Sequence, residues 1–156
     1  GGKFLYCTDQ EDVQQTFSEV LKENQWDGGA VYCHEKGLQE FFQHHGLQYT
    51  TDLEAPFCVL TCEYLIGNTG AILLSSNQIG EKKLEELPYN FVIYAGTSQL
   101  TETLGEGLRG IKARHQALPT NITTIKTFSE KLEKEGHFMT YGSTTKNLYL
   151  LLLEDL

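Results

Sequence analysis

Short runs of apolar residues that do not alternate with polar ones constrain the fold of this chain more than any other feature. They lie at residues 57–61, 71–75, 90–95, 122–126 and 148–154. A strand with one face in water alternates apolar and polar side chains, whereas a parallel strand that is covered on both faces reads as a continuous apolar run. The sequence therefore predicts a mainly parallel sheet that lies between two covering layers.

Helical patterns separate several of these runs. Thr8 and Glu11 have the spacing of a capping box, and the apolar residues after them predict an amphipathic helix over residues 9–24. A second helix, with Leu38, Phe41 and Phe42 on its inner face, should end at the glycine C-cap Gly46. A stripe at helical spacing predicts a later helix and consists of Leu100, Leu104, Leu108 and Ile111.

Strands that alternate with helices predict a layered α/β fold. Two further short strands are expected at residues 4–7 and 30–33. The step from residues 57–61 to 71–75 contains no helical pattern, so these two runs are candidates for an antiparallel pair, which would make the sheet mixed. The polar stretch at 129–146 predicts a solvated helix followed by a mobile loop.

Length and charge limit the class of protein. With 156 residues, 40% of them hydrophobic, the chain suffices for one packed domain, expected over residues 3–156, with residues 1–2 as a remnant of expression. The net charge of −9 argues against a nucleic-acid partner, because phosphate binding requires clustered lysine and arginine. The longest apolar run, at residues 148–153, is far shorter than the about 20 residues of a membrane-spanning helix, so no membrane partner is expected.

Cysteine and histidine positions do not predict a metal site. Cys58 and Cys62 would lie too far apart along a strand to bind one ion. His44 and His45 are neighbours on a predicted helix and point in different directions. Since no secretory signal is visible, we expect a cytoplasmic protein with reduced, mostly buried thiols. These thiols belong to Cys7, Cys33, Cys58 and Cys62.

The segment GEGLRG, residues 105–110, fits the pattern G-x-G-x-x-G of dinucleotide-binding loops. In that motif the glycines directly follow a strand and open a helix, whereas here they lie inside a helical stripe. We interpret them as small residues that permit close helix packing, and we expect no cofactor.

Two polar segments that adjoin predicted strands are candidate binding sites. Residues 67–70, with the sequence GNTG, precede the run at 71–75, and their glycines permit the positive φ of a tight turn. Thr97 or Ser98 follows the run at 90–95 and is expected to cap a helix. That position leaves backbone N–H groups free at the edge where open α/β sheets bind ligands.

The segments CEYLIGNTGAILLSS (62–76) and LPYNFVIYAGTSQL (87–100) resemble the LUD-domain family, which includes lactate-utilisation protein C. The matching positions are Cys62, Glu63, Leu65, Ile66, Thr69, Gly70, Ser75, Ser76, Pro88, Val92, Ile93, Thr97, Ser98, Gln99 and Leu100. The resemblance implies a three-layer α/β sandwich similar to the NagB/RpiA/CoA-transferase group. It also implies participation in the oxidation of L-lactate to pyruvate, with separate iron–sulfur subunits as partners.

One segment departs from the family pattern. After the predicted strand at 122–126, family members carry a loop resembling Gly-Pro-Ser-Arg-Thr-Ala-Asp-Ile-Glu and then a His-Gly-Pro turn. This chain has TFSEK at 127–131, and Gly142 alone remains of the later turn. An arginine beside backbone donors is suited to hold an anion, so we expect a divergent member with a weakened ligand site.

Three functions stay open. The first is an accessory component of L-lactate or other 2-hydroxy-acid oxidation, and the second is a non-catalytic binding or scaffold module with a degenerate site. The third is an enzyme that binds a small carboxylate, another anion or an acyl group. No catalytic residue is assigned. The candidate ligand-binding residues are Asn68, Thr69, Gly70, Thr97, Ser98, Gly142 and Lys146.

Overall fold

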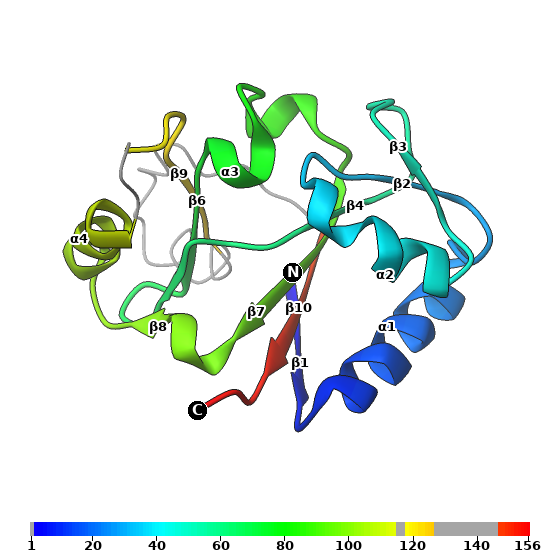
Figure 1. Cartoon of the computed structure of the whole chain (residues 1–156), viewed down its shortest axis with the longest axis horizontal. Coiled ribbons are helices and arrows are strands. Elements are labelled where there is room, and N and C mark those ends of the chain that lie inside the picture. The colour runs from blue at the N-terminus through cyan, green and yellow to red at the C-terminus, as the bar shows by residue number, and fades with distance from the viewer. Residues whose placement is uncertain (1, 115–117, 127–146) are drawn as a thin grey trace, which may run out of the picture.

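Six parallel strands form the large sheet of the computed structural model, which describes residues 2–114, 118–126 and 147–156 (Figure 1). In spatial order the strands are β1 (Gly2–Cys7), β10 (Asn147–Leu153), β7 (Asn90–Gly96), β4 (Cys58–Leu60), β2 (Ala30–Tyr32) and β3 (Gln48–Thr50). Every neighbouring pair is parallel. The central strands β10, β7 and β4 are three of the five continuous apolar runs, which confirms a mainly parallel sheet. The runs at 71–75 and 122–126 do not belong to it; they form antiparallel strands of a second sheet.

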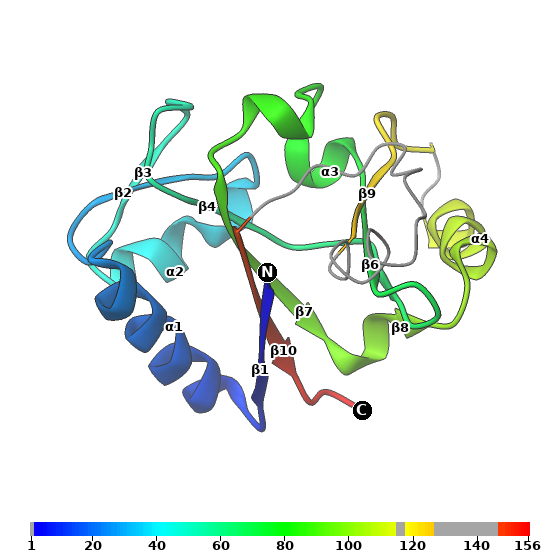
Figure 2. The ribbon, with the colours of Figure 1, turned by 180° about the vertical axis from the view of Figure 1, so that it is seen from behind.

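Helices α1 (Gln10–Asn24) and α2 (Gln39–His44) cover one face of this sheet (Figures 1 and 2). A 3₁₀ turn, η1 (Lys36–Leu38), precedes α2. The inner side chains of the two helices, with Phe17 and Phe42 at the centre, form one apolar cluster with Val59 and Val92 of the sheet. The C-cap of α2 is His45, one residue before the predicted Gly46, and Gly46 follows it with a φ of +70°.

The cap of α1 lies one residue later than predicted. Asp9, rather than Thr8, is the N-cap, and its carboxylate accepts a hydrogen bond from the Asp12 backbone N at 2.8 Å. The Asp12 carboxylate in turn accepts from the Thr8 backbone N at 3.0 Å. Aspartate and threonine both cap helices well, so the sequence alone did not distinguish the two neighbouring candidates.

A smaller, four-stranded sheet packs on the other face of the large sheet. In spatial order it contains β8 (Leu100–Thr101), β5 (Tyr64–Ile66), β6 (Ala71–Leu74) and β9 (Thr123–Lys126). The prediction that 57–61 pairs with 71–75 is wrong, because β4 already has β2 and β7 on its two edges. The antiparallel partner of β6 is β5, across the turn at 67–70.

Helix α4 (Leu104–Arg114) lies on the outer side of the smaller sheet and corrects two predictions. The predicted stripe faces the core only in part, since Ile111 is buried but Leu104 is 44% exposed. Thr97 and Ser98 do not cap this helix; they belong to a separate 3₁₀ turn, η3 (Thr97–Gln99), because β8 follows it and pairs with β5.

Two of the three glycines of α4, Gly107 and Gly110, have the packing role that the sequence predicts, whereas Gly105 has no such close neighbour among the described residues. A Cβ atom added to Gly110 would overlap the ring of Tyr64 on β5, so the ring would have to move. With α3 (Ser76–Ile79) and the 3₁₀ turn η2 (Leu84–Glu86), α4 and the smaller sheet complete the third layer. The expected three-layer α/β sandwich is thereby confirmed.

Among the described residues, no helix combines the length and apolar character needed to cross a membrane.

Candidate functional site

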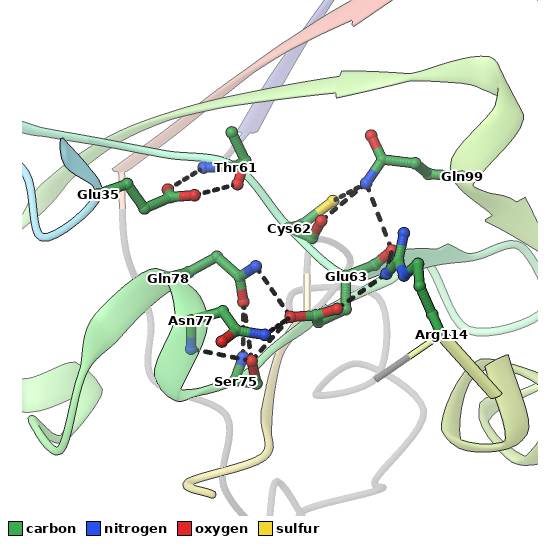
Figure 3. A network of polar contacts seen from close by, with 9 residues as sticks. All are labelled: Glu35, Thr61, Cys62, Glu63, Ser75, Asn77, Gln78, Gln99 and Arg114. Carbon is green, nitrogen blue, oxygen red and sulfur yellow. Dashed lines mark hydrogen bonds and ion pairs between the residues drawn. The ribbon is translucent and has the colours of Figure 1, made fainter. Parts of the chain in front are cut away.

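Polar side chains from distant parts of the chain gather beyond the carboxyl ends of β2 and β4 (Figure 3). Glu35 follows β2, residues 61–63 follow β4, and Gln99 lies in the turn after β7. Further donors come from the start of α3 and from Arg114 in the last turn of α4. Open α/β sheets bind ligands at this edge, so the network occupies the place where a site is expected.

Glu63 is the centre of this network although it is only 2% exposed. Its Oε2 atom accepts hydrogen bonds from Ser75 Oγ at 2.8 Å, Asn77 Nδ2 at 3.0 Å and Gln78 Nε2 at 3.0 Å. Its Oε1 atom forms an ion pair with Arg114 Nη2 at 2.8 Å. A buried carboxylate is tolerated when its charge and lone pairs are satisfied, and these four donors satisfy both.

The start of α3 orients three of these donors. Ser75 is the N-cap, and its Oγ accepts from the Asn77 backbone N at 3.1 Å. The Gln78 side chain completes the capping box, because its Oε1 accepts from the Ser75 backbone N at 2.8 Å. Sequence reasoning used Glu63 only as a family match and missed this role. The available signal was a glutamate among apolar residues followed by the capping sequence SSNQ.

Gln99 and Arg114 also hold the backbone of the segment after β4. Gln99 Nε2 donates to the Cys62 carbonyl oxygen at 2.7 Å. Arg114 Nη2 donates to the Glu63 carbonyl oxygen at 3.3 Å, and its guanidinium lies 4.9 Å from the ring centroid of Tyr64. The network therefore ties β5 to the turn after β7 and to α4.

A second carboxylate, that of Glu35, accepts two hydrogen bonds from Thr61. The Thr61 backbone N donates at 2.8 Å and its hydroxyl donates to the other oxygen. Burial raises the pKa of Glu35, and the bonds from Thr61 offset part of this effect. Burial also raises the pKa of the neighbouring Cys62 thiol to about 12. Because the thiolate is the reactive form of cysteine, Cys62 is an inert core residue at neutral pH.

The substitution Glu35→Gln should favour the folded state more at neutral pH than in acid. Since the folded-state pKa lies above the ordinary value of 4.5, the stability that Glu35 contributes is full below that pH and is lost as the pH rises through the folded-state pKa. Glutamine does not ionise, yet its oxygen still accepts from the Thr61 N–H. Urea denaturation near pH 4 and near pH 7.5 measures the stability difference between variant and wild type. A difference that stays constant or falls with pH would contradict the prediction.

Thr97 and Ser98 lie after β7 as expected, but the donors predicted to be free are engaged. The Asp155 carboxylate accepts from the Ser98 backbone N at 2.7 Å, from Ser98 Oγ at 2.7 Å and from Thr97 Oγ1 at 3.1 Å. The Ser98 hydroxyl and N–H lower the pKa of Asp155, which keeps this carboxylate charged. The absence of a side chain at Gly96 leaves room for this carboxylate, because an added Cβ would displace it from its position.

The turn at 67–70 has partners of its own. Gly70 adopts a φ of +68°, and the Asn68 backbone N donates to the Glu102 carbonyl oxygen at 3.0 Å. Thr69 Oγ1 accepts from the Ala71 backbone N at 3.3 Å. Gly70 borders an apolar cavity of about 260 Å³ between the two sheets.

The other proposed binding residues, Gly142 and Lys146, lie outside the described residues, so their relation to Thr97 and Ser98 stays a prediction. Within the described ranges, no group of three or more His, Cys, Asp or Glu residues is placed to hold a metal ion.

Comparison with known proteins gives a structural match without a sequence match. No family model matches the chain, and no curated protein matches it. The crystal structure of a DUF162 family protein from Deinococcus radiodurans matches with a TM-score of 0.66 over 98% of this chain and 88% of that chain. The two chains share this fold. DUF162 is another name for the LUD-domain family, so at 14% identity the chain has a fold similar to that of a LUD-domain protein.

Proposed function

We propose that this protein is a LUD-like accessory module that works with iron–sulfur subunits in the oxidation of L-lactate or a related 2-hydroxy acid. In this proposal the chain contributes binding to a partner, and its own sheet edge performs no chemistry. The LUD-like fold supports the reaction class, and the occupied polar groups at the sheet edge support the accessory role.

The hydrogen bonds from Ser98 to the Asp155 carboxylate are the main support for the accessory role. A small carboxylate would bind through donors of the kind found at Ser98 and Thr97. Asp155 already engages three of those donors with two oxygens. A free carboxylate ligand would therefore have to displace the Asp155 carboxylate from these donors. Because Asp155 is part of the same chain, its effective concentration at the donors is high, and it competes well against a free ligand.

The Glu63 network supports the same role. Its carboxylate accepts from three neutral donors and pairs with Arg114, the cation that would otherwise be available to an anionic substrate. Among the described residues, no buried side-chain nitrogen or oxygen lacks a hydrogen-bond partner. Groups poised for a ligand commonly stay unsatisfied until it binds, so this saturation favours a structural purpose for the network.

The accessory role is tested by reconstitution. The chain is mixed with purified iron–sulfur subunits of lactate oxidation from the same organism and analysed by size-exclusion chromatography. Lactate-dependent dye reduction is measured in parallel with and without the chain. We expect co-elution and a rate that depends on the chain. If the chain elutes alone and the rate is the same without it, the proposal is wrong.

Removing the tethered carboxylate should create a response to free carboxylates. In Asp155→Ala the Ser98 N–H and hydroxyl are released, while Thr97 Oγ1 keeps Glu154 Oε1 as an acceptor at 3.3 Å, so sodium L-lactate or acetate should raise the melting temperature in a concentration-dependent way. Sodium chloride at matched ionic strength is the control, and wild type should respond equally to all three salts. A specific lactate shift in wild type would instead support the alternative of a small-anion enzyme.

A further inference from the structure

A polar groove of about 470 Å³ lies between α1 and α2, in the helical layer of the fold. Gln14, Ser18 and Lys22 line it from α1, and His44 and His45 line it from the end of α2. Positions four apart lie above one another on a helix, so the three α1 side chains share one face. The groove thus brings a serine hydroxyl, an imidazole and a cation together.

The hydrogen bonds in this groove run in a defined direction. Ser18 Oγ lies 3.2 Å from His45 Nδ1, and His45 Nε2 lies 2.5 Å from Gln14 Oε1. An amide oxygen only accepts, so with the Gln14 amide in this orientation Nε2 carries the ring proton. Nδ1 is then the acceptor for the Ser18 hydroxyl. This is the order of nucleophile, base and orienting group that activates serine hydroxyls.

The surroundings of His45 preserve this arrangement. Its ring packs edge-on against Phe17 with centroids 4.9 Å apart, and at a tilt of 55° against Phe41 with centroids 4.8 Å apart. Burial lowers the pKa of His45, and the charge of His44 adds to the effect. The imidazole is therefore neutral at pH 7 and able to accept a proton. The charged and titratable side chains that line the groove besides His45 are Glu11, Lys22, Asp27 and His44.

We propose that Ser18 is a nucleophile activated by His45, and that the groove accepts small activated carboxylic esters. This activity is independent of the accessory role proposed above. Ser18 Oγ bonds to the carbonyl carbon while its proton passes to His45 Nδ1, and the alcohol leaves with that proton. Water, deprotonated by His45, then attacks the acyl carbon, the C–Oγ bond breaks, and His45 returns the proton to Ser18 Oγ as the acid is released. Lys22, one helical turn beyond Ser18, also lines the groove and is a source of positive charge for the oxyanion.

A fluorophosphonate probe tests the nucleophile directly. Attack forms an Oγ–P bond, breaks the P–F bond, transfers the hydroxyl proton to His45 and releases fluoride. Intact mass and peptide mapping of the full chain should show one adduct, on Ser18, and Ser18→Ala should show none. In His45→Gln labelling should be about 100-fold slower, as expected for loss of a general base. Ser76→Ala is the matched control, because the Ser76 hydroxyl accepts from the Thr120 N–H at 3.1 Å, and it should label like wild type.

The pH dependence of the labelling rate shows whether His45 activates Ser18 or only forms a structural hydrogen bond with it. The labelling rate of wild type should rise to a plateau with a midpoint below 6.5, the ordinary pKa of histidine. This readout decides the question even if His45→Gln fails to fold, which circular dichroism would show. The proposal is overturned if wild type carries no adduct on Ser18 or if folded His45→Gln labels at the wild-type rate. A wild-type rate that grows with hydroxide concentration without a plateau overturns it as well.

Discussion

Replacing Glu63 with alanine should lower the free energy of unfolding by about 3–5 kcal/mol. The side chain is 2% exposed, and the substitution takes the carboxylate acceptor from Ser75, Asn77 and Gln78. Arg114 loses its ion pair, but its side chain is 46% exposed and regains water. Most of the loss therefore comes from the donors of Ser75 and Gln78, which are buried, whereas Asn77 is exposed and can bond to water. Urea denaturation followed by circular dichroism measures the change.

Two further variants serve as comparisons for the stability loss of Glu63→Ala. Glu63→Gln keeps one oxygen to accept from the α3 donors but loses the charge that pairs with Arg114, so its loss should lie between those of wild type and Glu63→Ala. Glu19→Ala removes an exposed glutamate from α1 and should change stability by less than about 0.5 kcal/mol. If Glu63→Ala cost no more than Glu19→Ala, the network would not hold the layers together.

Phe57→Ala should destabilise the chain by about 3–5 kcal/mol, the range for removing a large aromatic ring from a packed core. Phe57 is fully buried, and its ring stacks on Trp26 with centroids 4.5 Å apart and an interplanar angle of 5°. Trp26 is the single tryptophan of the chain and is 8% exposed. Its fluorescence therefore reports both unfolding and any entry of water beside the ring in the folded state.

Phe4→Ala is the control for this prediction, since Phe4 lies on the edge strand β1 and is 53% exposed. Its substitution should cost less than about 1 kcal/mol. Equal losses for the two phenylalanines would mean that the cluster beneath α1 and α2 does not determine stability.

The parallel sheet could be predicted because β4, β7 and β10 are apolar on both faces, which leaves few other placements. The smaller sheet could not be predicted in the same way. Its strand β5 contains three residues, too few to show a period, and it follows β4 closely. The expected antiparallel pairing of residues 57–61 with 71–75 was therefore wrong, because β4 belongs to the large sheet and β6 pairs with β5 and β9 instead.

The location of Thr97 and Ser98 after β7 could be predicted, but the partners of their hydrogen-bond donors could not. Strand β7 followed by polar residues placed Thr97 and Ser98 at the ligand-binding edge of the sheet. Their acceptor, Asp155, is 57 residues away from Ser98 in the sequence, and no local pattern links the two. Glu63 was missed for the same reason, because its donors come from α3 and α4, which only the folded chain brings together.

The pairing of β1 with β10 has a consequence for how the chain folds. Gly2 lies opposite Leu148 and Cys7 opposite Leu153, so β1 finds its strand partner only after nearly the whole described sequence is available. Closing so long a loop before the contact forms is entropically slow, and parallel sheets built from distant segments fold in the slow part of the millisecond-to-second range. During synthesis, β1 and the apolar face of α1 would emerge long before the strand that completes their sheet, and they would depend on chaperones or on rapid completion of the chain to avoid aggregation.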